Sequence, residues 1–331
     1  MSESQAPRAP FRPVTTELHG DTRVDGYGYL KDREDQDTIP YLERENAFTD
    51  STMDSTKELQ ETLFNEFLSR IEEDDQSVPY RYGDYIYYDR TEKGKAYPIY
   101  CRKGLAPDAP EQILLDVNLL AEGHEYTSVG SFALSPNHRF LAFGVDHAGN
   151  ELYDVVIKDL DTGNMMPGKV EKAYYGLEWA NDNETLFFTR TDEAHRPDRL
   201  FKTLLSDLGK ETLVLEEPDD RFFLSVGKSQ SEDYIFISLD SAITSEVHVI
   251  DAKTPNNPPR LFAKRRDGVE YSISHWNQEF LILTNDGAQN FKLLRTPKDQ
   301  WGSDSWTDFI QESDDTLQAV LPFKDFFALY R

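Results

Sequence analysis

A repeat of about 46 residues is the feature that most constrains how this 331-residue chain can fold. Six runs of four mostly apolar or aromatic residues begin at positions 85, 140, 185, 234, 280 and 326, so successive starts lie 55, 45, 49, 46 and 46 residues apart. The runs are Tyr85–Tyr88, Phe140–Phe143, Thr185–Phe188, Tyr234–Ile237, Phe280–Leu283 and Phe326–Leu329. Short strands repeated at this period are typical of the blades of a β-propeller.

A further strand-like stretch follows each of the first five runs, for example Leu152–Ile157 and Val247–Ile250. Turn residues such as Asp161-Thr162-Gly163 separate the stretches. Only two residues follow the sixth run, so we expect the sixth blade to be incomplete and the chain to be a piece of something larger. A β-sandwich would not produce six regular repeats. The sequence therefore predicts a mainly β protein with an incomplete β-propeller over residues 76–331.

Residues 1–75 differ from the repeats and are predicted to form a separate extended and helical segment without strand alternation. Ser55 and Glu58 have the spacing of a capping box, which predicts a helix over about residues 56–72. Leu59, Leu63 and Phe67 recur every four residues and mark an apolar face of that helix. Such a face must pack against another surface, either an edge of the propeller or a domain absent from this sequence.

Composition indicates a soluble globular protein of the cytoplasm. The N-terminus lacks the basic and apolar regions of a signal peptide, and no apolar stretch approaches the roughly 20 residues that span a bilayer. The single cysteine, Cys101, cannot form an internal disulfide, which fits a reducing compartment. Its alternating neighbours favour a half-buried strand residue over a reactive thiol.

The formal net charge of −26 argues against two classes of partner, nucleic acids and anionic membrane surfaces. Two interpretations of the acidity remain open. The surplus carboxylates either maintain solubility or attract cationic ligands and speed their encounter with the protein.

Motifs for catalysis, metal binding and cofactor binding are missing from the sequence. No Gly-x-Ser-x-Gly elbow occurs, and neither Gly130-Ser131 nor Gly302-Ser303 has the second glycine. The seven histidines show no metal-ligand spacing, and no phosphate-binding glycine loop is present. The acidic run at residues 32–37 lacks the glycine of an EF-hand loop, so we interpret it as carboxylates that favour a helix N-terminus. The sequence predicts no catalytic residue, no cofactor and no metal in this chain.

Several longer stretches resemble the prolyl oligopeptidase family of serine peptidases, and oligopeptidase B within it. The N-terminal signature lies in residues 24–32 and 41–46, with Gly26 in place of the usual proline and Tyr29 in place of the usual tryptophan. The other carriers are Arg70-Ile71, Ser77–Arg81, Tyr97–Arg102, Asp219–Ser225, Gly268–Tyr271, and His275 with Leu283–Asn285. The resemblance runs from about residue 11 to the end of the sequence.

The resemblance implies a seven-bladed propeller that acts as a lid and size filter for a C-terminal α/β-hydrolase domain. Such enzymes cleave short peptides after Arg or Lys. The N-terminal helical segment of the family packs on the catalytic domain, which assigns that role to Leu59, Leu63 and Phe67. The matching interdomain hinge comprises Asp75, Gln76, Ser77, Val78 and Pro79; a solvated linker is the simpler interpretation, and both can hold.

The departure from the family is that the seventh blade and the hydrolase domain, with the Ser, Asp and His of its triad, are missing here. We therefore expect the chain to be the gating part of a serine peptidase and to be inactive alone. A stand-alone propeller that binds proteins or peptides is the alternative. A third interpretation is an enzyme that acts on small molecules at the propeller channel, but the sequence shows no cluster of acid–base or metal-binding residues that would support it.

Overall fold

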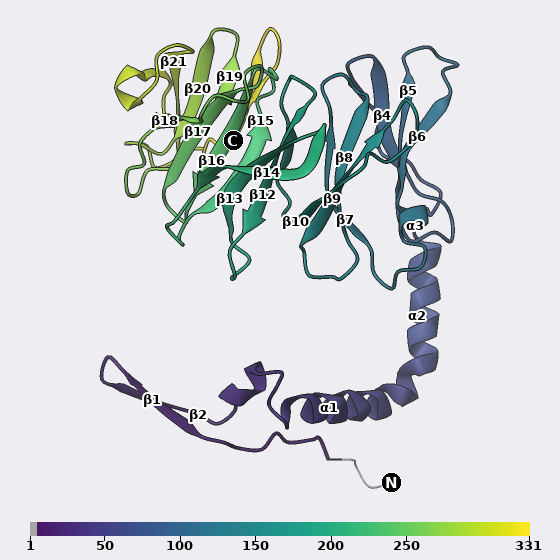
Figure 1. Ribbon diagram of the computed structural model, residues 1–331. Helices are drawn as coiled ribbons and strands as arrows, with labels where there is room; N and C mark the ends of the chain where they lie inside the picture. The colour runs from purple at the N-terminus through teal and green to yellow at the C-terminus, as the bar shows by residue number, and fades with distance from the viewer. Residues whose placement is uncertain (1–4) are drawn as a thin grey trace. The chain divides into compact units, whose positions relative to one another are not determined.

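The computed structural model describes residues 5–331, which form two compact units, one ending at Asp75 and one spanning Gln76–Arg331 (Figure 1). The repeats predicted as blades all lie in the second unit.

The first unit contains a β-hairpin that the sequence did not predict. Strands β1 (Val14–Leu18) and β2 (Asp21–Asp25) pair antiparallel, and His19 and Gly20 connect them with φ angles of 53° and 80°. Two left-handed residues in a two-residue loop are typical of the turns that match the twist of paired strands. Every residue of both strands is exposed, so the sequence carries no alternation of apolar and polar positions. The sequence analysis expected an extended and helical segment without strand alternation, and it did not anticipate that residues 14–25 pair as a hairpin.

Two helices follow the hairpin and a 3₁₀ turn at Gly28–Lys31: α1 (Thr38–Met53) and α2 (Lys57–Ser69). The predicted helix over residues 56–72 is confirmed as α2 with shorter ends, but the capping box is wrong. Thr56, not Ser55, precedes α2, and its side chain makes no capping hydrogen bond. A 3₁₀ turn at Asp54–Thr56 joins the helices, and the Asp54 carbonyl accepts the hydrogen bond from the Lys57 N–H. Backbone supplied by the preceding turn thus replaces the side-chain cap.

The acidic run at residues 32–37 directly precedes α1, and two of its carboxylates pair with Arg12. Asp37 is the N-cap residue of α1, but its side chain makes no capping hydrogen bond. Arg12 donates to Asp35 at 2.7 Å and also forms an ion pair with Asp37. The run thus lies at the N-terminus of α1 as predicted, and the structure adds an ion pair with Arg12, which is 23 residues from Asp35 along the chain.

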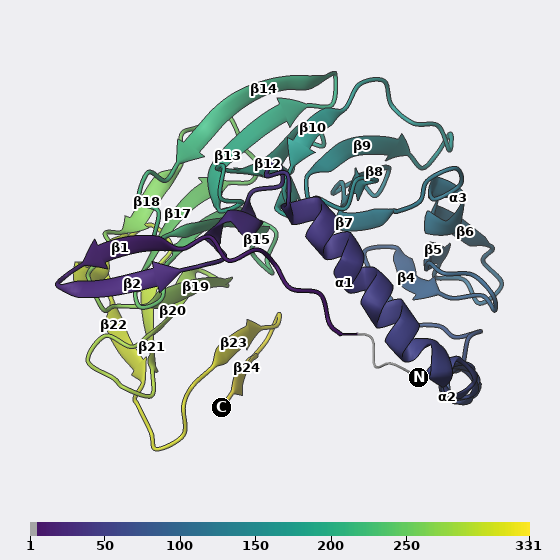
Figure 2. The same cartoon turned by 90° about the horizontal axis from the view of Figure 1, so that it is seen from below.

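The second unit consists of five four-stranded antiparallel sheets and one two-stranded sheet. Within each sheet the strands are hydrogen-bonded in chain order, and the first strands of successive sheets contact one another, as β7 with β11 and β11 with β15. The sheets follow one another around a common axis, as expected for a propeller (Figure 2). The first three sheets comprise β3 (Tyr80–Tyr82), β4 (Tyr85–Arg90), β5 (Ile99–Gly104) and β6 (Glu111–Asp116); β7 (Ser128–Leu134), β8 (Phe140–Asp146), β9 (Tyr153–Asp159) and β10 (Val170–Ala173); and β11 (Leu177–Trp179), β12 (Thr185–Thr191), β13 (Pro197–Leu204) and β14 (Asp207–Glu216).

The remaining sheets complete the described chain. They comprise β15 (Phe223–Lys228), β16 (Tyr234–Asp240), β17 (Ser245–Asp251) and β18 (Arg260–Ala263); β19 (Tyr271–Trp276), β20 (Glu279–Thr284), β21 (Lys292–Pro297) and β22 (Thr307–Ile310); and β23 (Ala319–Pro322) with β24 (Phe327–Tyr330). A short helix α3 (Val117–Leu120) and a 3₁₀ turn at Ser303–Ser305 lie in connections. Each predicted four-residue run falls at the second strand of a sheet, so the repeat analysis is confirmed.

The hydrophobic core of this unit is divided into layers between neighbouring sheets. One layer joins the third and fourth sheets through Phe187, Phe222 and Ile237, and another joins the second and third through Trp179 and Phe188. All five of these side chains are at most 3% exposed. Alternate strand residues therefore bury both faces of an inner sheet, and each sheet depends on its neighbours.

Antiparallel pairing gives every sheet two distinct ends. Residues 76–79 lead into β3 at one end, which we call the linker end; the β16–β17 turn and the β14–β15 and β18–β19 connections lie there too. The far end carries the turns between the first and second strands, such as Ser229–Asp233 between β15 and β16. Any group attached through residues 76–79 is tethered at the linker end.

Candidate functional site

Two of the five residues of the predicted hinge, Gln76 and Ser77, are bonded to strand β4. The Ser77 N–H donates to the Asp89 carbonyl of β4 at 2.9 Å, and the Asp89 N–H donates to the Ser77 hydroxyl at 3.0 Å. Gln76 forms an isolated β-bridge with Arg90. Val78 is 88% exposed. Gln76 and Ser77 are thus fixed to the first sheet, and the division between the compact units falls just before them, after Asp75.

The predicted apolar face of α2 is exposed within its own unit. Leu59, Leu63 and Phe67 are 58%, 38% and 61% exposed, and no residue of α2 is buried. Phe64 and Ile71 widen the face and are also exposed. Exposed apolar surfaces of this kind are often sites of contact with another protein surface.

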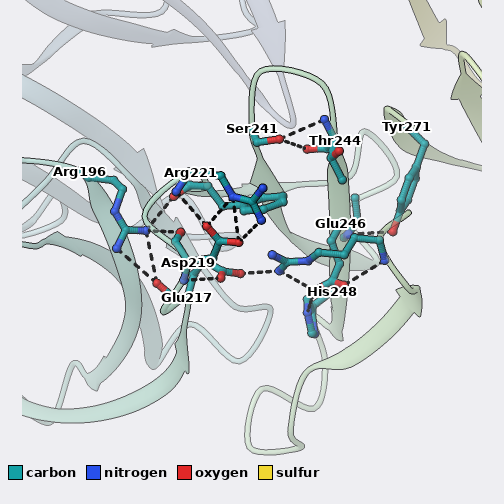
Figure 3. A network of polar contacts seen from close by, with 12 residues as sticks. Arg196, Glu217, Asp219, Arg221, Ser241, Thr244, Glu246, His248 and Tyr271 are labelled. Carbon is teal, nitrogen blue, oxygen red and sulfur yellow. Dashed lines mark hydrogen bonds and ion pairs between the residues drawn. The ribbon is translucent and has the colours of Figure 1, made fainter. Parts of the chain in front are cut away.

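A polar network at the linker end joins the third, fourth and fifth sheets (Figure 3). Arg196, in the β12–β13 turn, is 9% exposed and donates to the backbone carbonyls of Glu217, Asp219 and Phe222 at 3.3, 3.0 and 2.8 Å. Its Nε also donates to Asp192 at 2.9 Å. One buried guanidinium therefore satisfies three carbonyls of the β14–β15 connection, which has no ladder of its own to satisfy them.

The network continues through Arg265, which follows β18. Its guanidinium pairs with Glu217, which is 4% exposed, and donates to Glu246 of β17 at 3.0 Å. It also lies over the Phe222 ring, with its central carbon 3.9 Å from the ring centroid. Arginine suits such a position because its planar fork can bind two carboxylates while its face stacks on an aromatic ring.

Electrostatics hold two carboxylates of this network, those of Glu246 and Asp219, in the ionised form. Burial opposes ionisation of Glu246, but hydrogen bonds from His248 and Arg265 outweigh it and lower the pKa of Glu246 to about 2. The hydrogen bond from the Arg221 side chain, together with the Arg221 N–H, lowers the pKa of Asp219 to about 2. Both carboxylates therefore remain charged at neutral pH.

Two further side chains fix the strands around the network. The buried Tyr271 hydroxyl donates to the Ala263 carbonyl and accepts from the Val247 N–H, both at 2.8 Å. In the β16–β17 turn, the Ser241 hydroxyl bonds both the N–H and the carbonyl of Thr244 at 3.0 Å.

A groove with a volume of about 560 Å³ lies against this network. Its lining is mainly apolar, with Phe222 and Ile243 as the large apolar side chains and Arg221, Arg265 and Asp267 as the charged ones. Ile243 is 55% exposed. An exposed apolar side chain beside charged groups on a rigid frame is the arrangement of a protein contact surface.

A serine–histidine pair occurs at the far end, between the fourth and fifth sheets. The Ser231 hydroxyl lies 2.8 Å from His275 Nδ1, and an Asp233 oxygen lies 4.0 Å from the same nitrogen. The buried Nε2 of His275 has no hydrogen-bond partner within residues 5–331. A catalytic triad needs the carboxylate on the opposite ring nitrogen from the serine, so this pair is not arranged as one.

The remaining sequence candidates lie apart from the network. Ser131 is buried on β7, and Cys101 is 1% exposed on β5, so the cysteine is fully rather than half buried. Burial raises the pKa of the Cys101 thiol to about 11, which keeps the thiol protonated and unreactive. The described residues contain no group of three His, Cys, Asp or Glu side chains that could hold a metal ion.

The sequence analysis did not predict the network as a site, although several members lie in the family-like stretches 219–225 and 268–271. Arg196 and Arg265 lie outside those stretches, and apart from Asp192, four residues before Arg196, the partners named above are 19 to 48 residues away along the chain. The charged residues of these loops follow no sequence pattern that would predict which arginine pairs with which carboxylate or carbonyl.

Comparison with known proteins identifies the family. Residues 7–331 match the profile described as "Prolyl oligopeptidase, N-terminal beta-propeller domain". The chain belongs to the prolyl oligopeptidase family. Protease 2 of Moraxella lacunata is 39% identical over 328 residues, covering 96% of this chain and 47% of that protein. Dipeptidyl aminopeptidase BI of Pseudoxanthomonas mexicana is 36% identical, covering 90% of this chain and 44% of that protein.

Solved structures of this family have the same fold. Oligopeptidase B from Leishmania major superposes with a TM-score of 0.88 at 29% identity, over 96% of this chain and 48% of that one. Oligopeptidase B from Trypanosoma brucei, in a closed form with covalently bound antipain, gives a TM-score of 0.89 at 28% identity, over 98% of this chain and 49% of that one. The chain spans about half the length of the relatives it matches and corresponds to their N-terminal, propeller-containing half, so the predicted family and fold class are confirmed.

Helix length bears on membrane association. None of the helices within residues 5–331 is both long and apolar enough to cross a bilayer.

Proposed function

We propose that this chain is the gating propeller of an oligopeptidase-B-like serine peptidase that hydrolyses short peptides after Arg or Lys. The observation that carries the proposal is the match of residues 7–331 to the family's propeller, together with relatives in which this part is about half of a two-domain enzyme. A propeller placed over a catalytic domain limits access to short or unfolded peptides and shields the reaction from bulk water. The chain alone is then inactive.

The partner in this proposal is a C-terminal α/β-hydrolase domain. Two surfaces support it: the exposed apolar face of α2, built on Leu59, Leu63 and Phe67, and the groove at the linker end beside Phe222 and Ile243. Both carry apolar side chains that a partner would remove from water. The network around Arg196 and Arg265 would keep the groove rigid while the partner docks.

Opening and closing of the gate would bend the chain near residues 75–79. Because Gln76 and Ser77 are bonded to β4 and the compact units divide after Asp75, we place the bend at that division rather than across all five residues. Hinges are commonly a few loop residues that absorb a change in backbone angle. The free Cys101 thiol also fits a protein of the reducing cytoplasm.

A comparison of substrate lengths tests the gating role. The test protein is a fusion of this chain to the C-terminal half of Moraxella lacunata Protease 2. We expect it to cleave a five-residue Arg-Arg peptide at least 100-fold faster than the same sequence displayed in a loop of a folded protein. Equal cleavage of both substrates would contradict the gating role. Cleavage of neither substrate would contradict the peptidase assignment and favour a propeller that serves as a binding module.

A further inference from the structure

A cavity at the far end of the propeller is lined by the first strands of four successive sheets. It has a volume of about 350 Å³ and is lined by residues of β3, β7, β11 and β15 and of the turn after β15. First strands lie closest to the propeller axis, so the cavity opens on the axial channel. The network described above lies at the opposite end of the sheets.

The charged side chains that line this cavity include more carboxylates than ammonium groups. Glu178, Lys228 and Glu232 are its only charged lining residues among those the structure describes. Lys228 lies 3.6 Å from a Glu178 oxygen, and these side chains are 11% and 22% exposed. No lysine or arginine within residues 5–331 forms an ion pair with Glu232. One ammonium therefore faces two carboxylates in a partly buried setting.

The carboxylates of Glu178 and Glu232 influence each other's ionisation, and Glu232 also influences that of the Tyr82 phenol. Burial raises the pKa of Glu178, and the nearby charge of Glu232 raises it further against the effect of Lys228. Burial and the neighbouring Glu232 carboxylate likewise raise the pKa of Tyr82, so its phenol remains neutral. A second cation between Glu178 and Glu232 would relieve this repulsion.

Glu232 occupies a backbone position that disfavours it. The turns Ser135–Phe140, Ala180–Thr185 and Ser229–Tyr234 are closed by the same backbone hydrogen bond, at 2.9, 2.9 and 2.8 Å. The fourth residue of each turn is left-handed: His138, Asn183 and Glu232, with φ of 58°, 57° and 61°. Asparagine and glycine tolerate this conformation best, whereas glutamate is strained there. The Asn181 side chain donates to the Glu232 carbonyl at 2.7 Å and helps to hold the turn.

Aromatic side chains complete the cavity wall. Tyr80 and Tyr82 of β3 and Phe132 of β7 line it, and Tyr80 is 58% exposed. Aromatic faces attract cations and pack against aliphatic stems, and arginine does both more readily than lysine.

We propose that this cavity binds the arginine side chain of an incoming peptide, with Glu232 and Glu178 as the anionic partners and Tyr80 and Tyr82 flanking the stem. The inference rests on the proposed peptide-gating function and adds to it a capture site in the propeller itself. An arginine held at the far end concentrates basic peptides at the mouth of the channel.

Direct binding to the 331-residue chain tests the site. The probe is acetyl-Ala-Arg-Arg-Ala-amide, and its control replaces both arginines with citrulline, which keeps the shape and removes the charge. Calorimetry at low ionic strength should show binding of the arginine peptide that weakens as salt is added. Binding of the citrulline peptide with equal affinity would overturn the proposal, as would no binding of either.

Three variants distinguish a role of Glu232 and Lys228 in binding arginine from a purely structural role. Glu232→Asn should weaken arginine binding about tenfold, the size of one lost ion pair, while raising the thermal midpoint because asparagine suits the left-handed turn. Lys228→Gln should strengthen binding severalfold, since it removes the competing ammonium. Asp299→Asn is the matched control, because it removes one exposed charge at the same end outside the cavity and should change neither property.

The outcomes separate this site from the proposed function. Equal weakening by Asp299→Asn and Glu232→Asn would mean that net charge alone attracts the peptide, and would overturn the site. If the site fails while the fusion to the hydrolase domain still cleaves Arg-Arg peptides, only the capture site is wrong. If arginine binding is confirmed and the fusion is inactive, the peptidase assignment is wrong.

Discussion

At the scale of single residues, the stability of the linker end depends on a few buried charges with many partners. Arg196 and Arg265 each join segments that are distant in sequence, and their value lies in satisfying groups that would otherwise be buried unpaired. Removing such a charge leaves its partners unsatisfied, so its effect exceeds that of an exposed ion pair.

Arg196→Met tests this difference. The substitution leaves three backbone carbonyls without their donor and should lower the free energy of unfolding by about 3–5 kcal/mol, measured by urea denaturation. Arg221→Met is the matched control: it also removes an arginine paired with an aspartate, but one whose side chain is 71% exposed. It should leave the denaturation midpoint essentially unchanged. Equal losses from the two substitutions would contradict the assigned role of Arg196.

The low pKa of Glu246 predicts a loss of stability in acid. Its folded-state pKa of about 2 lies below the value of about 4.3 for an unfolded chain, so its contribution is complete above pH 4.3 and is lost as the pH falls toward 2. Glu246→Gln should flatten the dependence of stability on pH within this window. Glu193→Gln, in the exposed β12–β13 turn, should leave it intact. An unchanged pH dependence in Glu246→Gln would show that other carboxylates account for it.

At the scale of elements, the repeat period predicted the strands because their apolar runs are regular. Phe140–Phe143 and Tyr234–Ile237 begin β8 and β16 where expected, since packing between sheets requires buried residues at those positions. The β1–β2 hairpin was missed because all its residues are exposed and leave no burial pattern. The network around Arg196 could not be predicted, since pairings across 20 or more residues depend on the assembled sheets.

The anchoring of the linker to β4 predicts slow hydrogen exchange at one amide. In Ser77→Ala the Asp89 N–H loses its acceptor, so its exchange should accelerate about threefold to tenfold, consistent with a hydrogen bond worth about 1 kcal/mol. Ser77→Thr keeps the hydroxyl and should retain the protection, which hydrogen exchange with mass spectrometry would measure. Unchanged protection in Ser77→Ala would place the hinge elsewhere.

The apolar face of α2 predicts association of the isolated chain. Replacing Leu59, Leu63 and Phe67 together with glutamine should reduce binding of a hydrophobic dye and self-association in sedimentation velocity, because these side chains are exposed. Replacing Glu58, Glu61 and Glu66 with glutamine on the same helix should not reduce either one. A monomeric parent chain that binds no dye would contradict the docking role of this face.

At the scale of the whole molecule, the family match and the layered sheets describe the propeller-containing part of a prolyl oligopeptidase-family protein, and the gating role is our proposal. The acidity, with a net charge of −26, now has a more specific interpretation, because on the channel a single ammonium, that of Lys228, faces the two carboxylates of Glu178 and Glu232. A field of that sign favours cationic peptides over anionic ones before any of them reaches a catalytic domain. Sequence alone left both solubility and steering open as explanations of the acidity, since it could not show which carboxylates converge.

Hydrolysis of an Arg-Arg fluorogenic amide tests the central claim most directly. The 331-residue chain is assayed beside its fusion to the hydrolase half of Moraxella lacunata Protease 2. The account predicts hydrolysis by the fusion, blocked by a serine-directed inhibitor, and none by the chain alone. Inhibitor-sensitive hydrolysis by the 331-residue chain alone would contradict it, because residues 5–331 would then hold a catalytic serine that their geometry does not reveal.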